Sequence, residues 1–174
     1  MRWPAQFRVA PSTLLLWGGL GIPILVALIT TGDQPFFPTT DLAIMQTDLM
    51  HAPFSVPPVG VYSRYDFHHP GPALYVLLSP FWNVFGTRGL LIAAALFNIA
   101  LLGAILGTLR KIGGISLQLC GAAFLGWLVY GRLEDFINPW NPWIALLPFL
   151  LSILLCWACW QQTWWAFPGA VVAL

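Results

Sequence analysis

Long apolar runs, almost free of charged residues, constrain this chain more than any other feature of its sequence. They are Thr13–Thr30, Gly89–Leu109, Ile112–Tyr130 and Trp143–Trp160, and each is close to the roughly 20 residues that a helix needs to cross a bilayer. Only 7% of the 174 residues are charged, whereas soluble domains carry about 25%. So few charges cannot cover a water-soluble surface. The sequence therefore predicts an all-α, polytopic transmembrane helix bundle that forms a single membrane domain over residues 1–174.

A fifth apolar run begins at Trp164 and stops with the chain at Leu174. It is too short to be more than a partial span, and no polar tail follows it. We therefore expect the chain to be the truncated N-terminal part of a larger protein. A split subunit and a degenerate copy are the alternatives.

The segment Pro72–Gly86 is apolar, but it has only about 15 residues. Pro80 lies in its middle and is expected to break a helix, because proline has no N–H to donate. If this segment lies along the membrane surface, four basic residues fall on one side of the membrane, namely Arg2, Arg8, Arg110 and Lys111. The positive-inside rule favours this arrangement. The N-terminus is then cytoplasmic, and the protein is expected in the inner (cytoplasmic) membrane.

Two outer loops follow from this topology, residues 31–88 and residues 131–142. They contain all six acidic residues and all three histidines of the chain. Polar chemistry is therefore predicted on the outer face of the membrane. A loop as long as the first one is usually functional.

Within the first outer loop, Thr40–Met50 is predicted to form a short helix that lies in the membrane interface. At about 100° per residue, three apolar side chains form one stripe, namely Leu42, Met45 and Leu49. Asp41 and Asp48 are seven residues apart and sit almost in register at the edge of that stripe. Two solvated acids on a surface helix are the simpler interpretation.

The densest polar cluster of the chain runs from Tyr62 to Pro72 and reads Tyr-Ser-Arg-Tyr-Asp-Phe-His-His-Pro-Gly-Pro. Arg64 suits a phosphate group, because its guanidinium fork matches the phosphate oxygens. His68 and His69 point opposite ways on an extended chain, so the sequence supports no metal site and no particular cofactor. The alternative is an interfacial aromatic belt with incidental polar tips.

The second outer loop contains two turn dipeptides, Asn138-Pro139 and Asn141-Pro142. Trp140 and Trp143 are expected to anchor it in the interface. A plain turn between helices explains this loop at least as well as a catalytic role for its acidic residues. A Lys- or Arg-rich run typical of nucleic-acid binding is missing from the sequence.

These motifs together resemble the N-terminal part of the polytopic type C glycosyltransferases, which include protein-mannosyltransferase-like and lipid A sugar transferase-like bacterial membrane enzymes. The resemblance rests on Asp41 soon after the first span, on the cluster Tyr62–Tyr75, on Phe85-Gly86 and on the later segment Asn138–Pro148. It covers roughly residues 10–160, and its distinctive part is Ser-Arg-x-x-x-His-His-Pro-Gly-Pro.

The resemblance implies transfer of a sugar from a polyprenyl-phosphate donor on the outer face of the membrane, with Asp41 as the catalytic residue that acts as base or positions the acceptor. An inverting transfer needs a carboxylate to take the acceptor's proton and a cation to steady the leaving phosphate. The residues expected to bind the substrate are Arg64, His68, His69, Asp48 and Tyr62. The expected partners are the lipid-linked sugar, membrane lipid, and a missing C-terminal part or a partner subunit.

Two other classes of function stay open at this stage. A non-enzymatic membrane subunit that binds a lipid phosphate or a partner protein would have the same composition. A transporter is disfavoured, because transporters place polar or ionisable groups inside their spans. Here the spans contain only Asn98 and Gln118 as strongly polar side chains.

Overall fold

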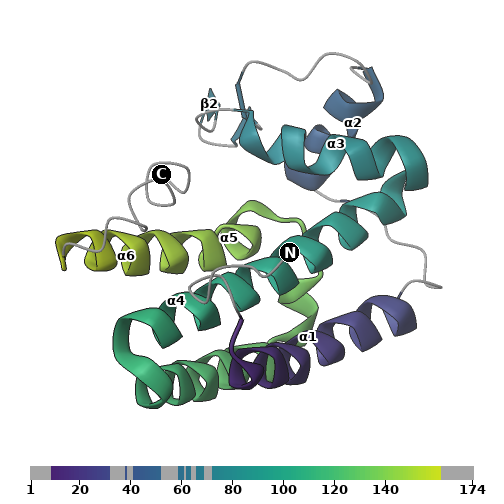
Figure 1. Cartoon of the computed structure of the whole chain (residues 1–174). Helices are drawn as coiled ribbons and strands as arrows, with labels where there is room; N and C mark the ends of the chain where they lie inside the picture. The colour runs from purple at the N-terminus through teal and green to yellow at the C-terminus, as the bar shows by residue number, and fades with distance from the viewer. Residues whose placement is uncertain are drawn as a thin grey trace, which may run out of the picture.

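The computed structural model shows an all-α protein whose long helices pack side by side (Figure 1). Three stretches are long and apolar enough to cross a membrane: α1 (Pro11–Thr31), α4 (Thr87–Gly131) and Pro142–Trp160, which contains α6 (Leu146–Trp160). The predicted fold class, an all-α transmembrane bundle, is confirmed. The residues that the structure describes are 9–31, 38, 41–51, 59–60, 62–63, 66–68 and 72–161. The predicted partial span 164–174 lies outside them.

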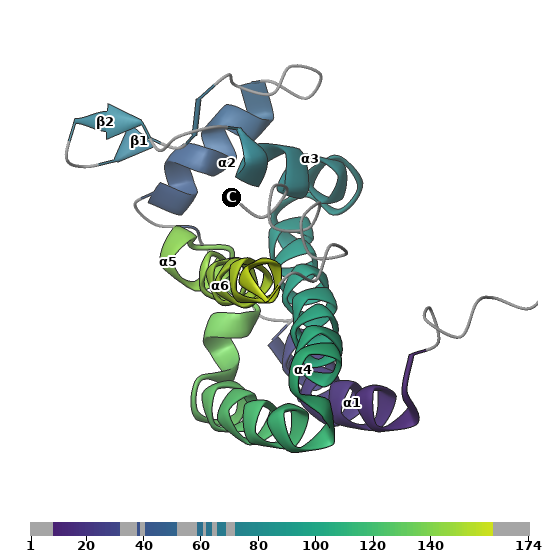
Figure 2. The same ribbon diagram turned by 60° about the vertical axis from the view of Figure 1, so that its left-hand side comes forward.

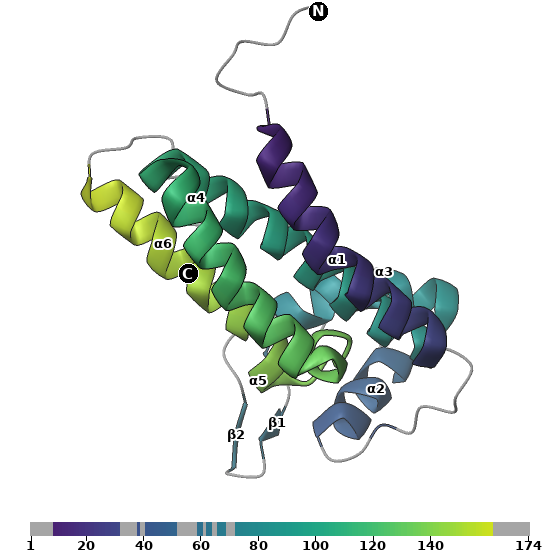
Figure 3. The ribbon, with the colours of Figure 1, turned by 90° about the horizontal axis from the view of Figure 1, so that it is seen from below.

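Helix α4 contains the second and third predicted spans, joined by a reversal of the chain (Figure 3). A straight helix of its 45 residues would be about 68 Å long, more than twice the roughly 30 Å of a bilayer's hydrocarbon core. The helix is broken at Gly113 and at Gly114, which adopts φ 68° and ψ −160°. That combination is open essentially to glycine alone. Beyond the break, the Gln118 side-chain amide donates to the Leu106 carbonyl at 3.2 Å, so the two halves lie side by side.

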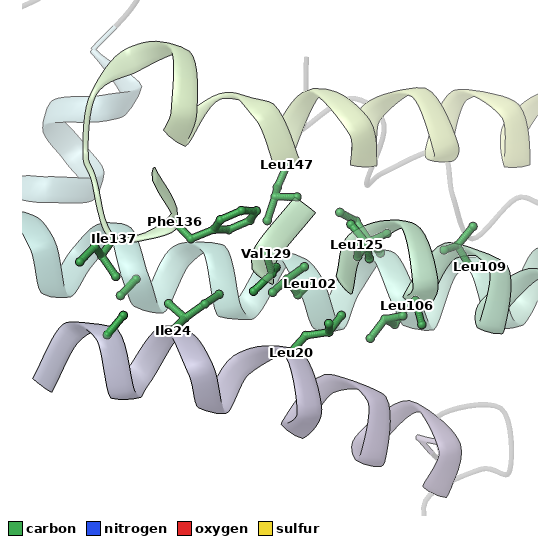
Figure 4. Packing of buried hydrophobic residues seen from close by; sticks show 14 residues of the cluster. Leu20, Ile24, Leu102, Leu106, Leu109, Leu125, Val129, Phe136, Ile137 and Leu147 are labelled. Carbon is green, nitrogen blue, oxygen red and sulfur yellow. The ribbon is translucent and has the colours of Figure 1, made fainter. Parts of the chain in front are cut away.

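One hydrophobic cluster holds the bundle together between α1, both halves of α4 and α6 (Figure 4). The 3-10 helix η2 (Leu133–Phe136), which follows α4, adds Phe136 to it. The other labelled members are Leu20, Ile24, Leu102, Leu106, Leu109, Leu125, Val129, Ile137 and Leu147. The outward side chains of the same helices are also apolar, as in Leu15 of α1 and Phe149 of α6. A bundle that is apolar inside and outside is suited to a lipid environment.

Polar side chains tie α1 to α4 inside the bundle. Gln118 is fully buried, and its amide nitrogen donates to Thr13 Oγ1 at 2.6 Å while its oxygen accepts from Ser12 Oγ at 3.0 Å. Trp17 Nε1 donates to the carbonyl oxygen of Ile99 at 2.7 Å. Each of these bonds joins two spans, so the few polar groups of the membrane interior are used for packing. This use differs from the ion or substrate pathways that polar groups line in transporters.

A second hydrophobic cluster joins three short helices, α2 (Asp41–His51), α3 (Ala73–Phe85) and α5 (Asn141–Ile144), to the first turns of α4. We call these three helices the outer cap, and their end of the bundle the outer end, after the side of the membrane predicted for them from the sequence. Figure 2 shows α2 and α3 together at one side of the long helices. The buried members of this cluster are Leu42, Met45, Leu49, Tyr75, Leu78, Leu90, Ala93, Ala94 and Ile144.

Helix α2 confirms the predicted short helix and its apolar stripe. Leu42, Met45 and Leu49 are all buried, with exposed fractions of 9%, 1% and 2%. Asp41 and Asp48 flank the stripe and are half-buried. The period of 3.6 residues therefore identified the packed face of this helix from the sequence.

Helix α3 corrects the expectation that Pro80 breaks the segment Pro72–Gly86. The helix runs from Ala73 to Phe85 with Pro80 inside it. The buried side chains of Tyr75 and Leu78 pack α3 against α2 and α4. This packing outweighs the one backbone hydrogen bond that proline removes. With 13 residues, about 20 Å, α3 is too short to cross the hydrocarbon core of a bilayer.

Two further elements complete the described chain. Strands β1 (Tyr62–Ser63) and β2 (Phe67–His68) form a small antiparallel hairpin in which Tyr62 pairs with His68. The extended chain that the sequence predicts around His68 is thus present. In the second outer loop, the predicted plain turn contains the helices η2 and α5, and α6 starts at Leu146 after a break at Ala145.

The two ends of the bundle differ in charge. The start of α1, the reversal of α4 and the end of α6 lie at one end, as the Ser12–Gln118 bond and the packing of Ile112 against Leu155 show. Arg110 and Lys111 belong to this end. The outer cap, η2 and all the described acidic residues belong to the other end. This segregation agrees with the topology predicted from the positive-inside rule.

We predict that Lys111 and Gln161 are accessible from the cytoplasm, together with the N-terminus, and that Asp41, His68 and Asn138 are accessible from outside. Single cysteines at these positions, in a chain whose three native cysteines are replaced by alanine, would be labelled with a membrane-impermeant maleimide from each side. Labelling of position 111 from outside would overturn the topology.

We also predict that Gly89→Ala opens the corner between α3 and α4. A Cβ atom at Gly89 would lie 2.1 Å from the carbonyl oxygen of Phe81, which as backbone cannot move aside alone. The expected loss of unfolding free energy is about 1–3 kcal/mol, measured by denaturant unfolding in detergent. Gly107→Ala is the matched control, because a Cβ atom there meets nothing within 4 Å. Equal stability of the two variants would contradict this account of the corner.

Candidate functional site

The two carboxylates of α2 form the centre of the candidate site at the outer end. Asp41 lies in the first turn of the helix and Asp48 lies two turns further on. Seven residues correspond to 700°, so the two side chains project in nearly the same direction, about 10 Å apart along the helix axis. Packing of the apolar stripe of α2 holds both groups at the rim of the outer cap.

The two carboxylates differ in their partners. Asp48 accepts a hydrogen bond from the hydroxyl group of Tyr75 in α3. Within the described residues, Asp41 has no hydrogen-bond or ion-pair partner. Of the two groups, Asp41 is therefore the one whose oxygens are available to a ligand.

Tyr75 is the most deeply placed polar group of the outer cap. Its side chain is 1% exposed and lies in the second hydrophobic cluster. Burial raises the pKa of the Tyr75 phenol well above its usual range, and the hydrogen bond to Asp48 and the negative charge of that carboxylate raise it further. The phenol therefore stays protonated and keeps donating to Asp48 throughout the physiological pH range.

A second polar contact fixes α2 against the bundle. Gln46 Nε2 donates to Thr87 Oγ1 at 3.3 Å, and Thr87 is the first residue of α4. Helix α2 is therefore held at two points, by Tyr75 of α3 and by Thr87 of α4. These two residues lie on either side of the corner that Gly86 and Gly89 form.

The hairpin contains two of the predicted substrate-binding residues, Tyr62 on β1 and His68 on β2. Strand β1 lies in contact with α2. His68 is exposed on β2, and its Nδ1–H donates to the carbonyl oxygen of Gly60 at 3.0 Å, which orients the imidazole ring. Of the other predicted residues, Arg64 and His69 lie outside the described part of the chain, and for Tyr62 only the backbone is described.

The second outer loop contains a charged group that sequence reasoning did not assign. The Arg132 guanidinium lies over the ring of Trp143, 4.2 Å from its centroid, and its Nε donates to Asp135 Oδ2. Arg132 is more than half exposed, so this ion pair contributes little to stability. Glu134 is exposed.

Two hollows lie beside Arg132 in the described part of the chain. The more enclosed one has a volume of about 20 Å³, which corresponds to about one water molecule, and it is lined by Leu128, Arg132, Asp135, Phe136, Trp143 and Leu146. The more open one has a volume of about 500 Å³ and is lined by Gly131, Arg132, Leu133, Glu134 and Asp135. The aromatic side of this loop is therefore packed, and its acidic side is open.

Asn98 connects this loop to the interior of the bundle. Its side chain is 1% exposed, and its amide nitrogen donates to the carbonyl oxygen of Phe136 at 2.9 Å. Its Oδ1 has no hydrogen-bond partner among the described residues. The bond to Phe136 holds η2 against α4 and gives Asn98 a structural use in the span.

The sequence pattern missed Tyr75, Gln46 and Thr87 as parts of the site. Tyr75 belongs to an apolar run, and its hydroxyl is the only feature that distinguishes it from the leucines around it. A buried tyrosine needs an acceptor for its O–H, and this requirement is the signal that could have pointed to Asp48. The distance in sequence, 27 residues, hid the pairing.

Comparisons with known proteins give no functional assignment for this chain, so its own residues are the basis for one. No family model, no curated protein and no solved structure matches this sequence. Among the described residues, no group of three or more His, Cys, Asp or Glu side chains could hold a metal ion. The described residues of the outer end present carboxylates, an oriented imidazole, hydroxyl groups and the Arg132 guanidinium.

We predict that Tyr75 does not ionise in the folded protein at about pH 11, where unperturbed phenols with a pKa of about 10 are ionised. The tyrosinate absorbance of the folded chain at this pH should be unchanged by Tyr75→Phe. In denaturant, the same substitution should remove one quarter of the signal, because the chain has four tyrosines.

The stability of the protein at alkaline pH should depend on the ionisation of the Tyr75 phenol. A pKa that is higher in the folded state gives stabilisation that is complete below about pH 10 and is lost as the pH rises towards the folded value. Tyr75→Phe should flatten this decline. Full titration of Tyr75 in the folded chain with the exposed phenols would contradict its burial and its bond to Asp48.

Proposed function

We propose that this chain is a membrane glycosyltransferase, or the N-terminal part of one, that transfers a sugar from a polyprenyl-phosphate donor at the outer face of the membrane. One observation carries the proposal. A helix that is too short and too acidic to cross the membrane is packed firmly at one end of a transmembrane bundle, with the carboxylate of Asp41 unengaged among the described residues.

The location suits a lipid-linked substrate. A polyprenyl chain dissolves in the hydrocarbon core, so its phosphate and sugar lie at headgroup depth. The outer cap lies at the end of the spans, and its own apolar cluster continues from the first turns of α4. The carboxylates of α2 are therefore placed where the donor's reacting atoms would be found.

The proposed chemistry is an inverting displacement at the anomeric carbon of the sugar. The Asp41 carboxylate takes the proton of the acceptor hydroxyl while the acceptor oxygen forms a bond to that carbon. The bond from the anomeric carbon to the phosphate oxygen breaks, and its electron pair leaves with the polyprenyl phosphate. A cation at the phosphate stabilises the negative charge that develops on this leaving group.

The motif residues supply the remaining groups in this proposal. Arg64 binds the phosphate of the carrier, because a guanidinium can contact two phosphate oxygens at once. His68 and His69 donate further hydrogen bonds, and Tyr62 completes the substrate-binding set. The resemblance to type C glycosyltransferases supports these assignments, and the contact between β1 and α2 supports placing the hairpin beside Asp41.

The proposal predicts that Asp41→Asn abolishes transfer and leaves membrane insertion intact. The measurement is release of radiolabelled sugar from a panel of polyprenyl-phosphate sugars by the purified chain in lipid vesicles. The loss of a general base should lower turnover about 10²- to 10⁴-fold. Asp135→Asn is the matched control, because that acid is engaged by Arg132 in the other loop.

The outcomes separate the proposal from its alternative. Sugar release by the unmodified chain that disappears in Asp41→Asn supports the proposal. Binding of polyprenyl phosphate without sugar release from any donor would overturn it in favour of a non-enzymatic subunit that binds the lipid. Equal sugar release by Asp41→Asn and the unmodified chain would remove Asp41 as the base.

A further inference from the structure

We infer that the hydrogen bond from Tyr75 to Asp48 sets the position of α2 along the outer cap, and that Tyr75 and Asp48 are positioning residues for Asp41. This inference rests on the proposed function for the importance of Asp41. It assigns Asp48 a different part from direct contact with the substrate, and it adds Tyr75, which the motif did not single out.

The apolar contacts of α2 define its position only to within part of a turn. A shift by a whole turn would bring Asp41, Gln46 or Asp48 into the buried stripe of Leu42, Met45 and Leu49, which is unfavourable. The stripe residues have similar size, and unbranched and γ-branched apolar side chains tolerate exchange with one another in a packed core. The apolar contact alone therefore leaves smaller displacements of the helix open.

The polar pair removes this ambiguity. The Tyr75 hydroxyl lies in a side chain that is 1% exposed, within an otherwise apolar cluster. A buried hydroxyl without an acceptor is strongly disfavoured, and Asp48 Oδ2 is its acceptor. Only the observed alignment places a carboxylate at the phenol, because residues 44 and 52, one turn before and after, are isoleucine and alanine.

Helix α2 transmits this alignment to Asp41. The two acids lie on the same side of one helix, two turns apart. Without the bond, a displacement of α2 by one residue's rise would move Asp41 by about 1.5 Å. That displacement exceeds the width of the range, roughly 2.6–3.2 Å, within which a general base can take a proton. The bond of Gln46 to Thr87 at 3.3 Å supports the same alignment from the side of α4.

Substitutions distinguish a positioning carboxylate from a reactive one. Asp48→Asn keeps an oxygen that can accept from Tyr75, so the alignment should survive. Tyr75→Phe removes the donor and leaves the half-buried Asp48 carboxylate without this hydrogen bond. A reactive or charge-binding Asp48 would give the opposite order, with Asp48→Asn the more damaging change.

The first measurement follows the docking of α2 and does not depend on activity. Met45→Cys is introduced into the full chain after replacement of Cys120, Cys156 and Cys159 by alanine, and its labelling by a maleimide is timed in vesicles. Met45 is 1% exposed, so the parent should label slowly. Tyr75→Phe should accelerate labelling about ten- to a hundredfold, the range expected for loss of a hydrogen bond to a charged group. Asp48→Asn should change it less than threefold, within about 0.6 kcal/mol.

Two controls accompany this measurement. Met50→Cys, on the exposed side of the same helix at 61% exposure, should label fast in every variant. Tyr130→Phe makes the same chemical change at an exposed tyrosine that bonds to the carbonyl oxygen of Gly19, and it should leave the labelling of Met45→Cys unchanged. Unchanged protection of Met45→Cys in Tyr75→Phe would overturn the inference.

The second measurement is sugar release with the donor identified above. Tyr75→Phe should lower kcat at least tenfold with little change in KM, because the donor's phosphate contacts remain. Asp48→Asn should keep most of the turnover. Loss of turnover in Asp48→Asn, with full turnover in Tyr75→Phe, would overturn the inference. If no variant releases sugar, the proposed function fails, and the labelling experiment still decides the part played by Tyr75 and Asp48.

Discussion

The reversal of α4 at Gly113 and Gly114 brings the described acidic residues of both outer loops to the same end of the bundle. Without it, a helix of 45 residues would extend far beyond a bilayer, and its second half would have no partner. With it, the two halves pack against each other and against α1. The first outer loop and the second then emerge at the same end. The acidic residues of both loops thus share one face, while Arg110 and Lys111 remain at the other.

The two larger hydrophobic clusters among the described residues have different tasks. The first joins the spans and is reinforced by the amide groups of Gln118 and Asn98, which bond between elements. The second holds α2, α3 and α5 on the first turns of α4. This separate cluster gives the outer cap a defined structure of its own at the end of the spans. The polar groups Tyr75 and Asp48 bond to each other there.

Much of this arrangement could be predicted from the sequence because it depends on composition and period. The length of the apolar runs predicted the spans, and the spacing of Leu42, Met45 and Leu49 predicted the packed face of α2. Pro80 was misjudged, because local propensity does not include the packing of Tyr75 and Leu78 that keeps α3 helical. The Tyr75–Asp48 bond and the stacking of Arg132 on Trp143 join residues whose proximity depends on the whole fold. Such pairs have no characteristic spacing in a single sequence.

The contact between Gln118 and the start of α1 has a consequence for biosynthesis. Ser12 and Thr13 bond to a residue that is 106 and 105 positions further along the chain. At about 5–20 residues per second, a ribosome needs roughly 5–20 s to make the intervening segment. During that interval α1 is already in the translocon or the lipid with its two hydroxyl groups unmatched by Gln118. Release of α1 into the bilayer and closure of the bundle are therefore separate events in time, and the second awaits the return half of α4.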